Sequence, residues 1–150
     1  MGAPPVLVIG MGHPDRGDDA VGRVVADRLL RDPLPGVKVV ATDGEAGKLL
    51  DLFDEADHVI IVDAGLSGAK PGTIHRLDAV TASLPRPMFA IGLVESIELA
   101  RTLGTLPRRC VVFAVEGERF DLGAGLSAPV AEAVDALVRL VADELRTELV

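Results

Sequence analysis

Short apolar runs alternate along the chain with segments whose apolar residues recur at helical spacing. Four of the runs are rich in β-branched residues and too short for helices, which predicts buried strands. A fifth segment alternates its residue types with a period of two, which is typical of an edge or antiparallel strand. The buried strands are expected at residues 5–10, 37–42, 58–64 and 109–115, and the edge strand at 72–78.

Between the strands, apolar residues three and four positions apart predict helices with one buried face. These helices are expected at residues 18–31, 46–56 and 92–103, with a last one that begins after Ser127. Ser127 fits an N-cap, and Pro129 falls in the first turn that follows. Alternation of strands and helices from end to end predicts an α/β fold. We therefore expect one domain over residues 1–150, a three-layer α/β/α sandwich with a mostly parallel central sheet.

Composition and charge narrow the classes of partner. Hydrophobic residues make up 49% and charged residues 25% of the chain, as in an ordinary soluble globular protein. The formal net charge is −8, and Tyr and Trp are absent, which argues against a nucleic acid or an anionic membrane as partner. Cys110 is the only cysteine, so an intrachain disulfide is excluded, and its apolar neighbours predict a buried strand residue. The first residues lack a secretory signal pattern, so we expect a cytoplasmic protein.

Acidic residues follow two of the predicted strands at the point where each strand ends. Asp18 and Asp19 come after the first strand, in GHPDRGDDAVG, and Asp63 ends the run HVIIVDAG. Ligands of open α/β sheets bind beyond the carboxyl ends of the strands, so Asp19 and Asp63 are expected on one rim. Asp18 also fits a helix N-cap, and Asp19 a first-turn residue that the helix dipole favours.

Besides the helix-capping role, three kinds of site are alternatives for this loop and its carboxylates. A dinucleotide site needs a third glycine after Gly10 and Gly12, but Asp15 stands in its place, and carboxylates would repel the phosphate. A two-carboxylate hydrolase needs two acids whose pKa values are pushed apart. A pair of metal ligands made of carboxylates alone suits Mg, Ca or Mn, whereas a nickel- or zinc-type ion usually takes imidazole as well.

Four segments in order resemble the hydrogenase maturation endopeptidases, the metallopeptidases that process [NiFe]-hydrogenase large subunits. The segments are VLVIGMGHPDRGDDAVGRVVADRL, VVATDGEAGKLLDLFDEADHVIIVDAG, GLVESIELARTLGTLP and DLGAGLSAPVAEAVDALV. The resemblance implies an enzyme that removes a C-terminal extension from the large-subunit precursor after nickel insertion. It also implies that two acids and one histidine contact the nickel held by the precursor. By position the acids are Asp19 and Asp63, which would coordinate the metal and help to polarise a water or the scissile carbonyl.

The sequence departs from the family pattern at the histidine. Family members commonly read S-x-H-G-x-G-L, whereas PMFAIGL places Phe89 at the histidine position, and phenylalanine cannot ligate a metal. In the first loop, His13 stands where the family usually has Asn. We therefore hypothesise that His13 supplies the missing imidazole beside Asp19 and Asp63. Without it, the chain would be a divergent protease, or a scaffold that binds the precursor without cutting it. A peptidase of the same fold with another substrate is a third alternative.

Other residues carry weaker expectations. His58 and His75 are expected to be structural or to face solvent. Asp43 and Gly44, with Gly47, resemble the glycine-rich turn of the family after the second strand, which would shape the substrate cleft. Gly22 is expected to permit close packing of the first helix.

Overall fold

The computed structural model describes residues 5–43, 45–85, 89 and 93–149. Its strands are β1 (Val6–Met11), β2 (Val37–Thr42), β3 (His58–Gly65), β4 (Ile74–Asp78) and β5 (Arg109–Glu116). Its helices are the 3-10 helix η1 (Gly17–Ala20) and α1 (Val21–Arg31), α2 (Ala46–Phe53), α3 (Leu93–Leu103) and α4 (Ala128–Leu149). The predicted order of strands and helices is confirmed. Helix α2 ends at Phe53 instead of residue 56, where the N–H of Asp54 bonds back to Asp51 and closes the last turn.

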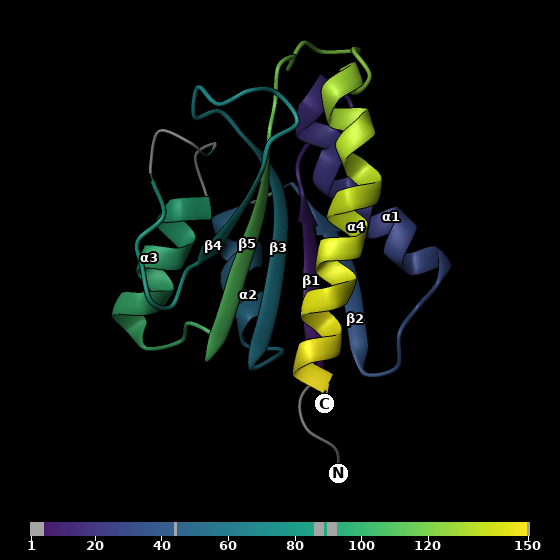
Figure 1. Ribbon diagram of the computed structural model, residues 1–150. Coiled ribbons are helices and arrows are strands. Elements are labelled where there is room, and N and C mark those ends of the chain that lie inside the picture. The colour runs from purple at the N-terminus through teal and green to yellow at the C-terminus, as the bar shows by residue number, and fades with distance from the viewer. Residues whose placement is uncertain (1–4, 44, 86–88, 90–92, 150) are drawn as a thin grey trace.

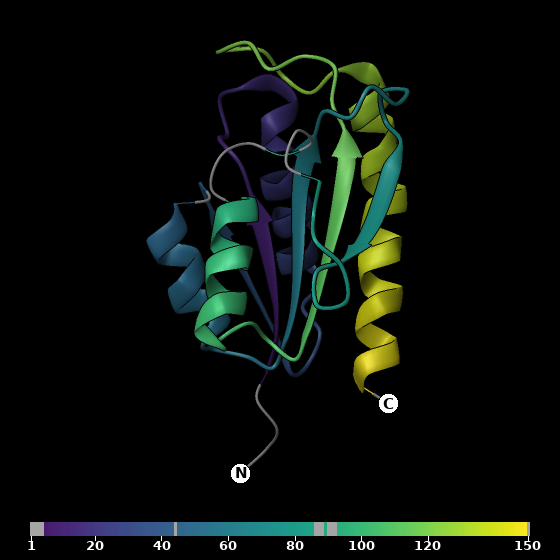
Figure 2. The same cartoon turned by 90° about the vertical axis from the view of Figure 1, so that its left-hand side faces the viewer.

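The strands form one five-stranded sheet in the order β2-β1-β3-β5-β4. Strands β1, β2, β3 and β5 are parallel, and β4 pairs antiparallel with β5 at one edge. The predicted edge strand and the mostly parallel sheet are therefore both confirmed. Figure 2 shows these directions: β3 and β5 run toward the upper end of the molecule, whereas β4 runs downward.

Helices cover both faces of the sheet (Figure 1), which confirms the three-layer sandwich. Alternate strand residues point to opposite faces: Leu7 and Ile9 pack toward α2 and α3, and Val6 and Val8 pack toward α1 and α4. A parallel strand buried on both faces reads as an unbroken apolar run, which is why these strands stand out in the sequence. None of the helices in the described ranges is long and apolar enough to span a bilayer.

Two residues singled out by the sequence lie near the amino ends of the strands. Cys110 is buried in β5, as expected, and burial raises the pKa of its thiol to about 12. His58 begins β3 and is also buried, and burial lowers the pKa of its imidazole. Because parallel strands start at the end of the sheet opposite their carboxyl ends, these residues lie away from the rim that carries the acids.

Candidate active site at the carboxyl ends of β1 and β3

Helix α1 packs closely against the ends of β1 and β3. A Cβ atom at Gly22 would lie 2.4 Å from the carbonyl oxygens of both Met11 and Val62, so only glycine permits this approach. The 3-10 helix η1 directly precedes α1, so it also lies near the ends of β1 and β3. Asp19, in η1, is thereby placed at the carboxyl ends of two neighbouring strands.

The loop after β1 folds back onto Asp19. Gly12 has a φ of +134°, and a Cβ atom there would lie 1.7 Å from the carbonyl oxygen of Asp19. The backbone N–H of His13 donates a hydrogen bond of 2.9 Å to Oδ2 of Asp19. The half-buried carboxylate is therefore held in place by the loop that the sequence singled out.

Asp63 lies near the carboxyl end of β3 with 4% of its surface exposed. Its Oδ1 accepts a hydrogen bond of 2.8 Å from the N–H of Ala64. Burial raises the pKa of Asp63 well above its usual range, and the charge of Asp19 raises it further, while the bond from Ala64 opposes both. The two acids predicted to share a rim are thus close enough to interact. A proton or a cation bound by this pair offsets both the free-energy cost of burying the charge and the repulsion between the two carboxylates.

Asp18 has a structural role that differs from the one expected. Helix α1 has Ala20 as its N-cap residue, so the prediction that Asp18 caps this helix is wrong. The fully buried carboxylate instead accepts hydrogen bonds from the N–H groups of Glu118, Arg119 and Ser127 and from the Ser127 hydroxyl. Burial acts to raise the pKa of Asp18, but these bonds outweigh it and leave the pKa lowered. Asp18 therefore ties η1 to the segment between β5 and α4.

His13 is exposed, and its ring is near enough to Asp43 to affect that residue. The N–H of Glu45 hydrogen-bonds Asp43 and lowers its pKa against the effect of desolvation, and the charges of Lys48 and His13 lower it further. Within the described ranges, no group of three or more His, Cys, Asp or Glu side chains is placed to hold a metal ion. The structure thus pairs Asp19 with Asp63, and His13 as a third ligand stays a prediction.

Phe89, at the position of the family's histidine, is a core residue. It is 8% exposed and belongs to the apolar cluster that joins the sheet to α2 and α3. The aromatic ring therefore contributes packing where the family pattern has a ligand.

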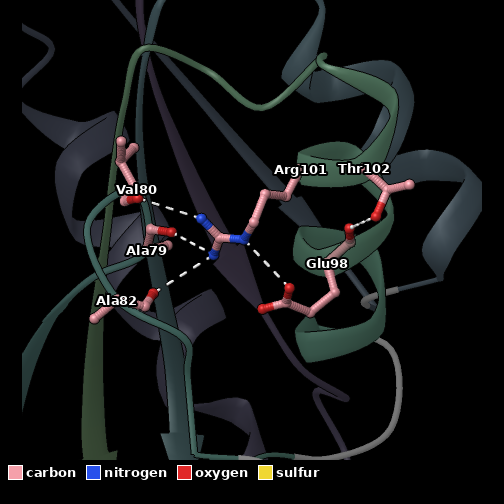
Figure 3. Close-up of polar contacts among 6 residues, drawn as sticks. All are labelled: Ala79, Val80, Ala82, Glu98, Arg101 and Thr102. Atoms are coloured by element: carbon pink, nitrogen blue, oxygen red, sulfur yellow. Dashed lines mark hydrogen bonds and ion pairs between the residues drawn. The ribbon is translucent and has the colours of Figure 1, made fainter.

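Arg101 of α3 anchors the start of the segment that leads from β4 to Phe89 (Figure 3). Its guanidinium donates hydrogen bonds to the carbonyl oxygens of Ala79 at 2.7 Å and Val80 at 3.2 Å. Its Nε also pairs with Glu98 at 3.2 Å. One side chain thus fixes the turn after β4 against α3.

A further buried carboxylate at this end of the sheet, in addition to Asp18 and Asp63, was not expected from the sequence. Glu116, at the end of β5, accepts hydrogen bonds from the N–H and hydroxyl of Ser67, and Nε2 of His75 lies 3.6 Å from it. Burial acts to raise the pKa of Glu116, but the bonds from Ser67 dominate and lower it. Glu116 therefore fixes the loop after β3. Its partner Ser67 lies 49 residues away, so no local sequence signal reports the contact.

A groove of about 440 Å³ lies beside this rim, between β2 and α2. It is lined by Asp43, together with Arg23 and Lys48. Arg23 also donates from its Nε to the carbonyl oxygen of Gly12, which joins the groove to the loop over Asp19. A Cβ atom at Gly47 would meet nothing within 4 Å, and Gly44 lies outside the described residues, so the role of this turn in a substrate cleft stays a prediction.

Comparison with known proteins shows that others share this fold. Among solved structures, the HybD maturating endopeptidase from Escherichia coli shares the fold with a TM-score of 0.79 at 24% identity, over 96% of this chain and 93% of its own. The HycI maturation protease from Thermococcus kodakarensis KOD1 has a TM-score of 0.72 at 26% identity, over 97% of this chain and 94% of its own.

Relatives in sequence point the same way. A Methanocaldococcus jannaschii protein, whose name places it among the hydrogenase maturation proteases, is 31% identical over 94% of this chain and 96% of its own length. The family model described as hydrogenase maturation protease matches residues 25–144. The chain therefore belongs to the hydrogenase maturation protease family, whose members are endopeptidases that process hydrogenase precursors.

Proposed function

We propose that this chain is a cytoplasmic endopeptidase that removes the C-terminal extension of a [NiFe]-hydrogenase large-subunit precursor after nickel has been inserted. The observation that carries the proposal is the interacting pair Asp19 and Asp63 at the carboxyl ends of β1 and β3. Family membership supports the class of substrate. The buried Asp63 and the half-buried Asp19, whose charge raises the pKa of Asp63, support a site that meets a cation. The nickel arrives as part of the substrate.

The raised pKa of Asp63 gives the pair its chemistry. A carboxyl group in this environment retains a proton that an exposed aspartate would have lost. An approaching cation favours the charged form, so the proton leaves as the metal of the substrate arrives. Binding of the nickel-loaded precursor is therefore expected to weaken as the pH falls, because protons and metal compete for the same oxygens.

In the proposed cleavage, a water attacks the scissile carbonyl carbon and the peptide C–N bond breaks. Asp19 and Asp63 contact the metal of the precursor. A carboxylate of the pair takes a proton from the water and passes it to the leaving amine, so a carboxylic acid and an amine are formed. One water is consumed for each bond cut.

A second candidate function is binding of the precursor without cleavage. Phe89 favours it, because a core phenylalanine occupies the position of the family's histidine. A scaffold of this kind would form a complex that survives substitution of Asp19 and Asp63 and leaves the precursor intact.

Mass spectrometry of the nickel-loaded precursor after incubation with this protein separates the two functions. The variants are Asp19→Asn and Asp63→Asn, which keep the shape of the side chain and remove its charge. Asp143→Asn is the matched control, because Asp143 is an exposed carboxylate on α4 that pairs with Arg146. We expect the wild type and the control to release a defined C-terminal peptide, and both site variants to release at least 100-fold less.

Release that persists in both site variants contradicts the role of the carboxylate pair. An intact precursor that still binds the wild type favours the scaffold. His13→Ala tests the third ligand separately: loss of cleavage supports His13 as the substitute for the histidine, and unchanged cleavage removes it from the site.

A further inference from the structure

The outer edge of β2 leaves backbone hydrogen-bonding groups facing away from the sheet. The carbonyl oxygens of Gly36 and Thr42 accept hydrogen bonds of 3.0 Å from β1 and the residue that follows it. Parallel ladders use alternate residues of a strand, so the N–H and C=O groups of Val39 and Ala41 point outward. Among the described residues, no backbone group from another segment bonds to either of these two. Strand β2 is the outermost strand beyond β1 in the sheet (Figure 1).

The groove of about 440 Å³ runs along this same edge. Val40–Thr42 of β2 and Asp43 after it form one wall, and Lys48, Asp51 and Leu52 of α2 line the other. The groove thus combines an apolar stretch with charges of both signs beside an unused strand edge. Such a combination suits an extended peptide, whose backbone pairs with the edge while alternate side chains enter the groove.

The groove adjoins the loop that holds Asp19. Its residues Arg23 and Thr42 both hydrogen-bond the backbone of Gly12. The N–H of the next residue, His13, donates to Asp19. A chain that lay along Val39–Asp43 would therefore continue over the loop that holds Asp19.

The other parts of the sheet edges are less suited to this task. The amino half of β2 carries Lys38, which forms an ion pair with Glu55 across the edge. At the opposite edge, β4 runs antiparallel, so its carboxyl end lies at the end of the molecule away from Asp63. Arg76 of β4 is also bound to Glu144 of α4. Charged edge residues of this kind discourage pairing with another chain.

We propose that Val39–Thr42 of β2, Asp43 after it and the adjoining groove bind an extended segment of the precursor by β-strand addition. This inference rests on the proposed function for the identity of the chain that is bound. At about 3.3 Å per residue, the edge accommodates roughly four residues of the precursor. Its pairing fixes the direction in which the scissile bond is presented to Asp19 and Asp63.

Ala41→Pro tests the pairing, with Leu122→Pro as the matched control. Proline removes the outward N–H of residue 41, which the sheet itself does not use, and edge strands tolerate proline at such positions. Leu122 is exposed in the turn between β5 and α4 that the N–H of Ala124 closes on Asp121, and proline is favoured at this position of a turn. With the nickel-loaded precursor as substrate, we expect Ala41→Pro to raise KM about tenfold and leave kcat within twofold, and Leu122→Pro to match the wild type. Circular dichroism checks that both variants fold.

The outcomes separate this inference from the endopeptidase proposal. If Ala41→Pro matches the wild type in KM, strand addition is overturned while the endopeptidase stands. If the wild type binds the precursor without cutting it and Ala41→Pro weakens that binding tenfold, strand addition stands and the endopeptidase falls. Amide hydrogen exchange of the wild type gives a second measurement that needs no variant: the precursor should slow exchange at Ala41 at least tenfold and leave Val40, already bonded within the sheet, unchanged. Equal exchange at Ala41 with and without precursor overturns the proposal.

Discussion

Replacing Asp18 by asparagine should destabilise the fold, although the side chain keeps its size. Oδ2 of Asp18 accepts three hydrogen bonds, from the N–H groups of Glu118 and Arg119 and the hydroxyl of Ser127, at 2.8 to 2.9 Å. Oδ1 accepts the N–H of Ser127 at 2.7 Å. The amide oxygen of asparagine can take the place of Oδ2, but its NH₂ group then faces the N–H of Ser127, and donor meets donor.

The size of the effect follows from these four bonds. A hydrogen bond to a charged group contributes about 1.5–3 kcal/mol, and one between neutral groups about 0.5–1.5 kcal/mol. In Asp18→Asn, the three bonds to Oδ2 become bonds to a neutral oxygen and weaken, and the fourth, from the N–H of Ser127, is lost. The lower cost of burying a neutral group offsets part of this sum. We expect the free energy of unfolding to fall by about 3 kcal/mol in Asp18→Asn. In Asp18→Ala, all four donors lose their partner, and a fall of about 5 kcal/mol would bring a typical domain close to unfolding.

Urea denaturation followed by circular dichroism measures the change, since the chain has no Trp or Tyr for fluorescence. The control is Asp15→Asn, an exposed neighbour in the same loop, which should stay within about 0.5 kcal/mol of the wild type. The folded-state pKa of Asp18 is lowered, so its contribution is present above the unfolded pKa of about 3.9 and is lost as the pH falls through the folded-state value. An Asp18→Asn variant as stable as Asp15→Asn at pH 7 would refute the structural role assigned to Asp18.

Three further predictions concern the rim and the core. Asp63→Asn should leave the protein as stable or more stable at pH 7, because the folded-state pKa of Asp63 is raised and its ionisation opposes folding as the pH rises. Each unit of difference between the folded and unfolded pKa changes the free energy of unfolding by about 1.4 kcal/mol, and chemical denaturation measures this change. Gly12→Ala should lower the melting temperature by several degrees and abolish cleavage, because the new Cβ displaces the backbone of Asp19; calorimetry and the precursor assay test both. Cys110 should react with a thiol reagent only after denaturation, since burial raises its pKa to about 12; labelling of the native protein within minutes would contradict this.

Much of the fold could be predicted because burial leaves a direct pattern in the sequence. Strands covered by helices on both faces are apolar along their central positions, so the runs at 58–64 and 109–115 stand out. The segment 72–78 is less apolar because β4 lies at an edge, and this too is visible in the sequence. The end of α2 was missed because residues 54–56 continue a helix-compatible sequence, and the last turn closes through a backbone bond that leaves no pattern.

The candidate site could be predicted only as far as topology determines it. Parallel neighbouring strands are expected to bring Asp19 and Asp63 to one rim. In the structure β1 pairs parallel with β3, and the charge of Asp19 acts on Asp63. The role of Asp18 could not be predicted, since its partners lie at least 100 residues away and three of the four donors are backbone N–H groups, which almost any residue supplies. The contact of Glu116 with Ser67 is hidden for the same reason.

The central claim is that Asp19 and Asp63 meet the metal carried by the precursor. The most direct test compares the affinity of the wild type and of Asp63→Asn for nickel-loaded and nickel-free precursor, measured by biolayer interferometry at pH 7.5 within the first seconds of contact. The account predicts that nickel tightens binding to the wild type by at least tenfold and makes no difference to Asp63→Asn. An equal gain from nickel in both proteins would contradict it.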